Sequence, residues 1–266
     1  MNEFSQHDME TETRLARIEG KVDALVGRID DIVITQLRDH GKRIQALESR
    51  MLWAAGWMAG AGAVGGYVLE GLVRAGVGHI RVIDADVFSE SNMNRQILAT
   101  TDTIGRNKAE VAAERARSIN PDIDIIPVCR MVSEETVPDL LKDRPDVLAD
   151  AIDTIAHKVS LLRYAAENGI PTFSSMGAAL HTDTLALRSA TLKRTRVCPL
   201  ASAVRSRLRD LDTSGITCVY SEEPPIARPD SRDDHGKSIL GSLPTVPAAF
   251  GMTIANLIIM HLVSDH

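Results

Sequence analysis

Polar and charged residues between positions 84 and 108 have the composition expected of a site that handles phosphates. Asp84 ends a short apolar run, the segment DVFSESNMNRQ contains Asn92, Arg95 and Gln96, and Lys108 follows in IGRNKAE. Two cations and two amides in one segment suit a triphosphate that is being cleaved, because charge that develops on phosphoryl oxygens must be stabilised. A nicotinamide-dependent oxidoreductase, which holds only a diphosphate, would give Arg95 and Lys108 no role.

A glycine-rich segment precedes these residues. Gly60, Gly62 and Gly65 form the pattern G-x-G-x-x-G. Glycines in this pattern let the backbone approach a phosphate, and the helix that follows offers free N–H groups. Asp84, at the end of the next apolar run, fits an acceptor for a ribose hydroxyl. Dinucleotide-binding dehydrogenases share both features, so these features indicate a nucleotide without specifying which one.

A further acid, Asp153, follows the apolar run at 147–152. A carboxylate at the end of a central strand suits magnesium, which prefers oxygen ligands and often sits beside substrate phosphates. Each charged residue named so far, taken singly, is explained as well by a solvated surface position. Their order along the chain favours a triphosphate site.

The elements that must position these residues begin with an uncharged stretch of 19 residues at 51–69. Its length alone would allow a membrane span. The abundance of glycine and alanine at 59–66, and a second apolar run at 80–84, favour instead a strand, a glycine turn, a helix and a second strand. This order is a βαβ unit.

Helix and strand patterns then alternate. We expect helices over 108–119, 156–168 and 199–209, strands over 123–128, 147–152, 171–174 and 217–221, an antiparallel strand near 185–188 and an apolar helix within 246–263. Such alternation predicts an α/β protein with a Rossmann-like, doubly wound, mostly parallel sheet and an antiparallel extension. Residues 53–180 would form the nucleotide-binding module and 181–266 an antiparallel or substrate-binding part. The polar, proline-containing segment 222–242 is expected to be a mobile loop.

The N-terminal region has a different pattern. Residues 1–12 are polar and are expected to be disordered, and 13–52 carry apolar residues at alternating spacings of three and four, with one skip near Val33. The repeat includes Leu15, Ile18, Val22, Leu25, Ile29 and Ile32. This spacing predicts a coiled-coil helix that associates with itself. A single helix packed on its own domain is the alternative.

Composition limits the class of protein. The formal net charge is -6, which argues against general nucleic-acid binding through bulk charge. Cys129, Cys198 and Cys218 form no C-x-x-C pair, so we expect free thiols in a reducing cytoplasm and no structural zinc. No secretory signal pattern occurs at the N-terminus. The apolar segment 246–263 could contact a membrane, although a buried helix over the sheet is the favoured interpretation.

A local basic cluster could still hold tRNA phosphates. Six cations lie within 17 residues: Lys193, Arg194, Arg196, Arg205, Arg207 and Arg209. Neutralised phosphates supply much of the affinity for nucleic acids. A solvated helix face explains the cluster equally well.

The run GAGAVGGYVLEGLVRAGVGHIRVIDADVFSESNMNRQ, with Lys108 and ADAIDT, resembles the ThiF, MoeB and HesA group of adenylating enzymes related to ubiquitin activators. The resemblance covers residues 58–263. Within that group, VCPLASAVRSRLR, ITCVYSEEPP and GSLPTVPAAFGMTIAN are most similar to the branch that dehydrates threonylcarbamoyladenosine in tRNA.

The resemblance implies ATP and magnesium as the cofactors and a cytoplasmic homodimer that adenylates the threonyl carboxylate of the modified adenosine next to the anticodon. It also implies that Asp84 binds the ribose, that Asn92, Arg95 and Lys108 contact phosphates, and that Asp153 binds magnesium. Arg95, Lys108 and Asp153 would be the catalytic residues. Asp86 and Gln96 match the ATP-binding motif, with roles that the resemblance leaves open.

Two other functions stay open at this point. One is adenylation of the C-terminus of a sulfur-carrier protein within a sulfur-transfer system. The other is a non-catalytic scaffold, coiled or tethered to a membrane, with a vestigial nucleotide fold. Ala63 stands where the family usually has glycine, the first strand is poor in β-branched residues, and only Arg43 or Arg50 could stand in for an N-terminal arginine that relatives extend toward the partner's ATP.

Overall fold

The computed structural model describes residues 14–29, 33–36, 51, 54–224 and 243–264. The chain divides into two units, Met1–Ser49 and Arg50–His266. In the first unit, residues 14–29 and 33–36 are helical. The expected disorder at 1–12, most of the loop at 222–242, and Arg43 and Arg50 lie outside the described residues.

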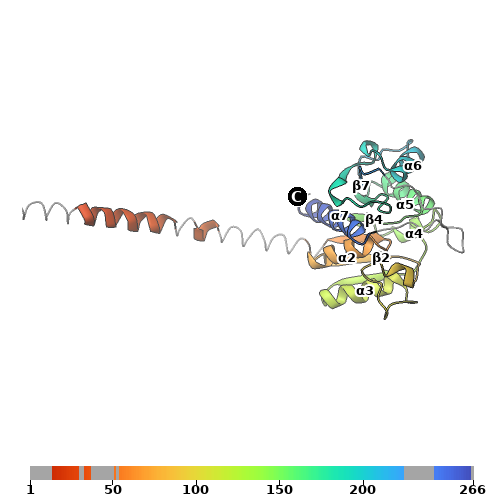
Figure 1. Ribbon diagram of the computed structural model, residues 1–266, viewed down its shortest axis with the longest axis horizontal. Coiled ribbons are helices and arrows are strands. Elements are labelled where there is room, and N and C mark those ends of the chain that lie inside the picture. The colour runs from red at the N-terminus through yellow and green to blue at the C-terminus, as the bar shows by residue number, and fades with distance from the viewer. Residues whose placement is uncertain (1–13, 30–32, 37–50, 52–53, 225–242, 265–266) are drawn as a thin grey trace, which may run out of the picture. The chain divides into compact units, whose positions relative to one another are not determined.

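The second unit is built on one seven-stranded sheet with the order β3-β2-β1-β4-β5-β7-β6 (Figure 1). The strands are β1 (Ala55–Ala59), β2 (His79–Ile83), β3 (Asp124–Val128), β4 (Val147–Asp150), β5 (Thr172–Ser175), β6 (Leu187–Thr191) and β7 (Ile216–Ser221). All neighbours pair in parallel except β6 and β7, which are antiparallel. The expected doubly wound α/β sheet with an antiparallel extension is confirmed.

Helices cover both faces of the sheet. They are α2 (Gly65–Arg74), α3 (Lys108–Ile119), α4 (Val137–Leu140), α5 (Ile155–Glu167), α6 (Pro199–Arg207) and α7 (Thr245–Ser264), with short 3-10 turns η1 (Glu90–Asn92), η2 (Thr184–Ala186) and η3 (Leu192–Arg194). The apolar residues of α2, α3 and α7 share one core with Met58 of β1, and those of α4 and α5 share another with Trp57. Alternate residues of β1 therefore face opposite layers, as the pleat of a strand requires.

Strand β1 forms despite its weak strand propensity because it lies between two parallel partners. Its register pairs Trp57 with Arg81 of β2 and with Leu148 of β4. Four of its five residues are buried. Burial and pairing on both edges outweigh intrinsic preference, so residues 55–69 of the uncharged stretch are a strand, a turn and the start of a helix rather than a membrane span.

The sheet continues past residue 180, where we expected the nucleotide-binding module to end and an antiparallel or substrate-binding part to begin. β7 pairs in parallel with β5, and α7 packs along α2, where the two helices lie side by side (Figure 1). Among the described residues α7 is the one helix long and apolar enough to cross a membrane. Its residues Val246, Phe250, Ile254 and Ile258 are buried in the core shared with α2, which favours a core helix.

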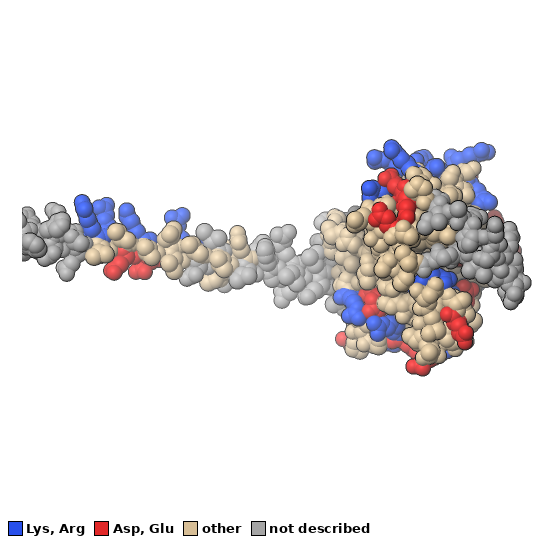
Figure 2. Space-filling view, in the orientation of Figure 1, with Lys and Arg blue, Asp and Glu red and all other residues tan. Residues whose placement is uncertain are grey.

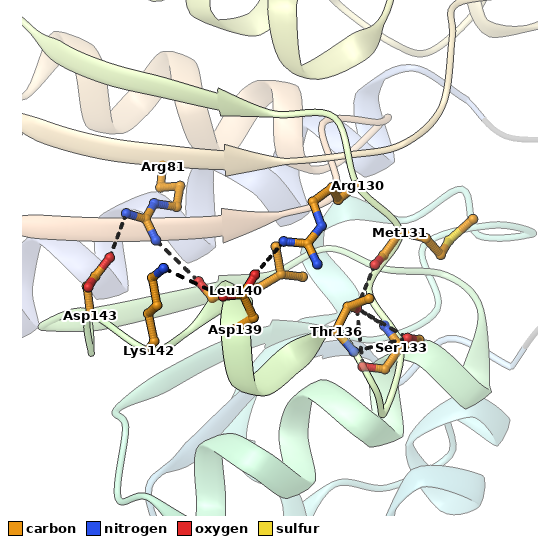
Figure 3. A network of polar contacts seen from close by, with 9 residues as sticks. All are labelled: Arg81, Arg130, Met131, Ser133, Thr136, Asp139, Leu140, Lys142 and Asp143. Atoms are coloured by element: carbon orange, nitrogen blue, oxygen red, sulfur yellow. Dashed lines mark hydrogen bonds and ion pairs between the residues drawn. The ribbon is translucent and has the colours of Figure 1, made fainter.

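A network of polar contacts fixes α4 against one face of the sheet (Figure 3). Arg81 on β2 donates to the carbonyl of Leu140 and to Asp143, and its guanidinium lies 4.0 Å from the ring centroid of Trp57. Arg130 pairs with Asp139, and the hydrogen bond between them lowers the pKa of that carboxyl. These contacts orient the segment between β3 and β4.

The contact between α2 and α7 depends on two glycines. A Cβ on Gly251 would lie 2.6 Å from Tyr67 Cβ and from the carbonyl oxygen of Val64, and a Cβ on Gly71 would lie 2.6 Å from Ala255 Cβ. Real Cβ atoms do not approach so closely, so both positions require glycine unless the helices separate.

We predict that Gly251→Val lowers the free energy of unfolding by about 1–3 kcal/mol, because the added side chain must push α7 away from α2. Denaturant titration followed by circular dichroism measures the loss. Met260→Ala, at an exposed position of the same helix, should change it by less than about 0.5 kcal/mol. Equal stability of the two variants would contradict the close helix contact.

Candidate active site

The glycine loop lies where the strand order reverses, between β1 and β4. Gly60 has φ +95, and a Cβ there would lie 3.0 Å from the backbone of Ala151, in the loop after β4. A Cβ on Gly65 would lie 1.7 Å from the carbonyl oxygen of Gly60. Gly60 and Gly65 therefore have to be glycine, whereas a Cβ on Gly62 would make only ordinary contacts, the nearest at 3.9 Å.

The loop is able to accept a phosphate. Within the part of the chain that the structure describes, no hydrogen bond is formed by the N–H groups of Gly62, Ala63 and Val64, which lead into α2. Free N–H groups at a helix N-terminus bind anions, aided by the helix dipole. Ala63 is partly exposed and does not adopt a left-handed backbone, so alanine fits there without strain.

Asp84 links the loop to the end of β2. One carboxylate oxygen accepts the N–H of Ala61 at 2.7 Å and the other accepts the N–H of Asp86 at 2.8 Å. Burial raises the pKa of Asp84, and these two N–H donors and nearby Lys108 oppose the rise. Each oxygen retains a second lone pair that could accept a ribose hydroxyl.

Lys108 is held at the start of α3. Its ammonium lies 3.1 Å from a carboxylate oxygen of Asp86, and its backbone N–H donates a hydrogen bond to the backbone carbonyl of Asp86. The lysine side chain is 8% exposed and the aspartate side chain 65% exposed. Asn107 caps this helix by accepting the N–H of Ala109. The helix start thus presents one largely desolvated cation beside Asp84.

The other motif residues divide into two kinds. Asn92 accepts the N–H of Ser89, and Arg95 donates to the carbonyl of Ser91, so in this structure both hold the turn around η1 together. Gln96 is different because its buried Oε1 has no hydrogen-bond partner among the described residues. The Gln96 side-chain nitrogen is within 3.9 Å of a Cβ built on Gly62, which places this amide directly beside the glycine loop.

Asp153 lies in the loop between β4 and α5. It is exposed, and Thr154 donates a hydrogen bond of 3.2 Å to its carboxylate. β4 ends at Asp150, before the end that we expected at 152, so Asp153 stands beyond the sheet edge rather than at a strand end. The described residues contain no group of three or more His, Cys, Asp or Glu that could hold a metal without other ligands.

Three buried residues beneath this loop were missed from the sequence. Asp150 and Lys158 have fully buried side chains and form an ion pair, and Ser174 on β5 donates to the same carboxylate oxygen at 2.6 Å. Lys158 also donates to the carbonyl of Ser175 at 2.9 Å. The other oxygen of Asp150 accepts the N–H of Ile152. Two sequence features could have identified this group: an acid inside a buried strand, and a lysine on the apolar face of α5.

The loop after β5 reaches the same edge of the sheet. His181 is buried, burial lowers its pKa, and its Nδ1 lies 3.7 Å from Glu223. Glu223 accepts the N–H groups of Thr182 and Asp183, and these bonds lower the pKa of that carboxyl. Glu223, near the start of the segment 222–242, therefore holds the loop after β5 in place through hydrogen bonds.

The basic cluster lies apart from the glycine loop, around η3 and α6. Figure 2 shows Lys and Arg side chains gathered over the region where Figure 1 places α6. This surface comprises five exposed cations: Lys193, Arg194, Arg196, Arg207 and Arg209. Arg205 is half-buried and donates to the carbonyl and hydroxyl of Thr195, so it supports the fold of this region.

The thiols have distinct surroundings. Cys198 and Cys218 are buried, and burial raises the pKa of Cys218 to about 12. Cys129 is exposed after β3, where its Sγ contacts the side-chain oxygen of Asn107, and partial burial raises its pKa as well. Cys198, which we expected to be a free thiol, is thus shielded from solvent.

A glycine loop at the reversal point of a doubly wound sheet, an acid after the second strand and a desolvated lysine define a nucleotide-binding α/β protein. The chain belongs to the ThiF family, whose model matches residues 47–266. It is 35% identical over 213 residues to a tRNA threonylcarbamoyladenosine dehydratase of Bacillus subtilis, a match that covers 77% of this chain and 84% of the relative.

Solved structures give the same grouping. The tRNA N6-threonylcarbamoyladenosine dehydratase of Escherichia coli in complex with AMP is 31% identical with a TM-score of 0.75, covering 84% of this chain and 89% of that one. The same enzyme in complex with ATP is 30% identical with a TM-score of 0.74 over the same shares. The expected family and its dehydratase branch are therefore confirmed.

We predict that Lys158→Met lowers the free energy of unfolding by about 3–5 kcal/mol, because it leaves the Asp150 carboxylate buried and unpaired. The double variant Asp150→Asn with Lys158→Met should recover most of that loss, since neither charge then remains. Denaturant titration of the three proteins provides the comparison. A double variant no more stable than the single one would contradict the ion pair.

Proposed function

We propose that this chain is an ATP-dependent dehydratase that activates the threonyl carboxylate of threonylcarbamoyladenosine in tRNA by adenylation and so yields the cyclic form. The observation that carries the proposal is the glycine loop, Asp84 and Lys108 meeting at the reversal point of the sheet. The similarity to dehydratases whose structures contain ATP and AMP supports it.

The chemistry explains why ATP is needed. A carboxylate is a poor electrophile, and attack of its oxygen on the α-phosphorus of ATP, with loss of pyrophosphate, converts it to an acyl adenylate. A nucleophile of the same modified side chain then attacks the acyl carbon, and AMP leaves with the carboxylate oxygen. Water is removed overall, at the expense of ATP cleavage to AMP and pyrophosphate.

Each residue has a task in binding or orientation. The N–H groups of Gly62, Ala63 and Val64 would receive phosphate oxygens, and Asp84 the ribose hydroxyls. Lys108, desolvated on most of its surface, would stabilise charge on the phosphates more strongly than an exposed lysine could. The unpaired Oε1 of Gln96 indicates that this amide also takes part in binding.

Asn92 and Arg95 are assigned differently. Their side chains bond to the turn around η1, so a phosphate contact requires Arg95 to exchange its bond to the carbonyl of Ser91 for one to the nucleotide. A charge-assisted bond to phosphate is stronger than one to a neutral carbonyl. Asn92 would act mainly by holding Arg95 and Gln96 in place.

Magnesium would bind through Asp153. Magnesium typically takes one or two carboxylates and completes its shell with substrate phosphates and water. A single exposed carboxylate beside the glycine loop fits that pattern. The ion would neutralise phosphate charge during loss of pyrophosphate.

The exposed members of the basic cluster would hold the tRNA backbone. They form a local positive surface on a chain of net charge -6. We place the enzyme in the cytoplasm with its tRNA and propose that it works as a homodimer. A membrane contact through α7 would require its buried residues to leave the core, and we do not include one.

We predict that Lys108→Ala and Asp153→Ala each abolish adenylation while the circular dichroism spectrum stays unchanged. The assay is ATP–pyrophosphate exchange with and without threonylcarbamoyladenosine-containing tRNA. Lys142→Ala, which removes an exposed lysine just after α4, serves as the control and should retain full exchange. Turnover in both site variants would overturn the assignment.

The exchange assay and measurements of nucleotide binding separate the alternative functions. Exchange that depends on a sulfur-carrier protein ending in Gly-Gly, and not on tRNA, would replace the proposed substrate. No binding of magnesium-ATP by calorimetry would indicate a scaffold with a vestigial site. Dinucleotide binding in place of ATP would indicate an oxidoreductase.

We predict that replacing Lys193, Arg194 and Arg196 together by alanine weakens tRNA binding and reduces its salt dependence. The slope should fall by about 1 for each phosphate that the variant no longer neutralises. Filter binding over a series of salt concentrations measures both effects. The matched control replaces Arg74, Lys142 and Arg144, which lie elsewhere on the same unit. Equal effects of the two triple variants would exclude a specific role for the cluster.

A further inference from the structure

The N-terminal helix at 14–29 carries an exposed apolar face. Five residues at heptad spacing line it: Leu15, Ile18, Val22, Leu25 and Ile29, each 51–58% exposed. Neighbouring Val26 is also half exposed. A row of large aliphatic side chains along four turns of helix is costly to leave in water, so the face is expected to be covered.

The heptad positions identify what covers it. Leu15, Val22 and Ile29 occupy the first core position of the repeat, and Ile18 and Leu25 the second. Val22 and Ile29 at the first position, with Leu25 at the second, follow the pattern that favours two-stranded parallel coils, whereas Leu15 with Ile18 does not. A second copy of this same helix supplies a complementary row of identical spacing.

The flanking charges determine the direction of pairing. Arg14, Lys21 and Arg28 all fall on one flank of the core row, and Glu19 falls on the other. Figure 2 shows basic and acidic side chains on opposite edges of this helix. Flanking residues of this kind choose partner and orientation in coiled coils.

In an antiparallel pair, the flank with the three cations would face the same flank of the other helix. Arg14 would then meet Arg28 and Lys21 would meet Lys21, which is repulsive. In a parallel, in-register pair each flank faces the opposite flank of the partner helix. Arg14 then meets Glu19, and the aliphatic stems of Lys21 and Arg28 can lie over Val26 and Val33.

We propose that two copies of this chain associate through residues 14–29 as a parallel, in-register coiled coil. The proposal concerns the N-terminal unit alone and does not depend on the activity of the other unit. It requires that equivalent residues of the two helices lie opposite one another, which gives a direct test of direction.

The test uses disulfide formation in the full-length chain with Cys129→Ser, which removes the exposed native thiol. Under mild oxidation Ile18→Cys should give a covalent dimer within minutes, because equivalent core positions adjoin in a parallel pair. Gly20→Cys, on the outer face, should cross-link at least about tenfold more slowly. No preference for position 18 would overturn the proposal.

Two further arms test the direction. If a mixture of Ile18→Cys and Val22→Cys chains forms mainly the mixed dimer, while Ile18→Cys does not cross-link with itself, the pair is antiparallel and the proposal fails. The charge variant Glu19→Lys should slow cross-linking at position 18 by roughly three- to tenfold, the range for loss of exposed ion pairs. Arg14→Glu combined with Glu19→Lys should restore it.

The matched control is Asp23→Lys, which makes the same charge change away from the core row. It should leave the cross-linking rate within about twofold of the parent. An equal slowing by Asp23→Lys and Glu19→Lys would mean that only net charge matters and would contradict the proposed pairing of flanks. The pairing of flanks is supported only if Glu19→Lys alone slows the reaction and Arg14→Glu restores it.

Discussion

The close approach of two loops at the reversal point of the sheet is the constraint on which the rest of the structure depends. The loop after β1 and the loop after β4 touch, because Gly60 lies against the backbone of Ala151 and Gly65 against the carbonyl of Gly60. No other residue type fits at these two positions. This contact aims the N-terminus of α2, with its free N–H groups, toward the side of the sheet where Asp84 and Lys108 lie. A nucleotide site here follows from packing before any side chain contacts a ligand.

A buried ion pair supports the second of these loops. Lys158 and Asp150 are removed from water together, which costs free energy that their attraction only partly offsets. The pair nevertheless joins β4, β5 and α5 at one point, and through the N–H of Ile152 it holds the loop that carries Asp153. A positioning function of this kind would explain why a charged pair stands where apolar residues would pack as well. The exposed cations around α6, by contrast, contribute little to stability and are available to a polyanion.

The two units of the chain differ in how their apolar surface is buried. The ThiF unit closes its apolar surface within one sheet and its covering helices, with α7 packed beside α2 through Gly251 and Gly71. The N-terminal helix at 14–29 carries an apolar row that is more than half exposed. Association with a second copy would bury this aliphatic row between two chains, whereas the ThiF unit buries its apolar surface within one chain.

The sequence by itself determined the order of the elements, the doubly wound sheet and the family, because hydrophobic periods and glycine positions are local signals. It also singled out Gly60, Asp84 and Lys108, which the structure brings to one end of the sheet, whereas the magnesium role of Asp153 stays a prediction. Only the tertiary structure decided that Asn92 and Arg95 bond to their own turn, that Gln96 has an unpaired buried oxygen, and that Asp150, Lys158 and Ser174 meet. These facts depend on contacts between residues distant in sequence, which no periodicity reports. The same reason explains β1, whose weak propensity is overcome by pairing on both edges.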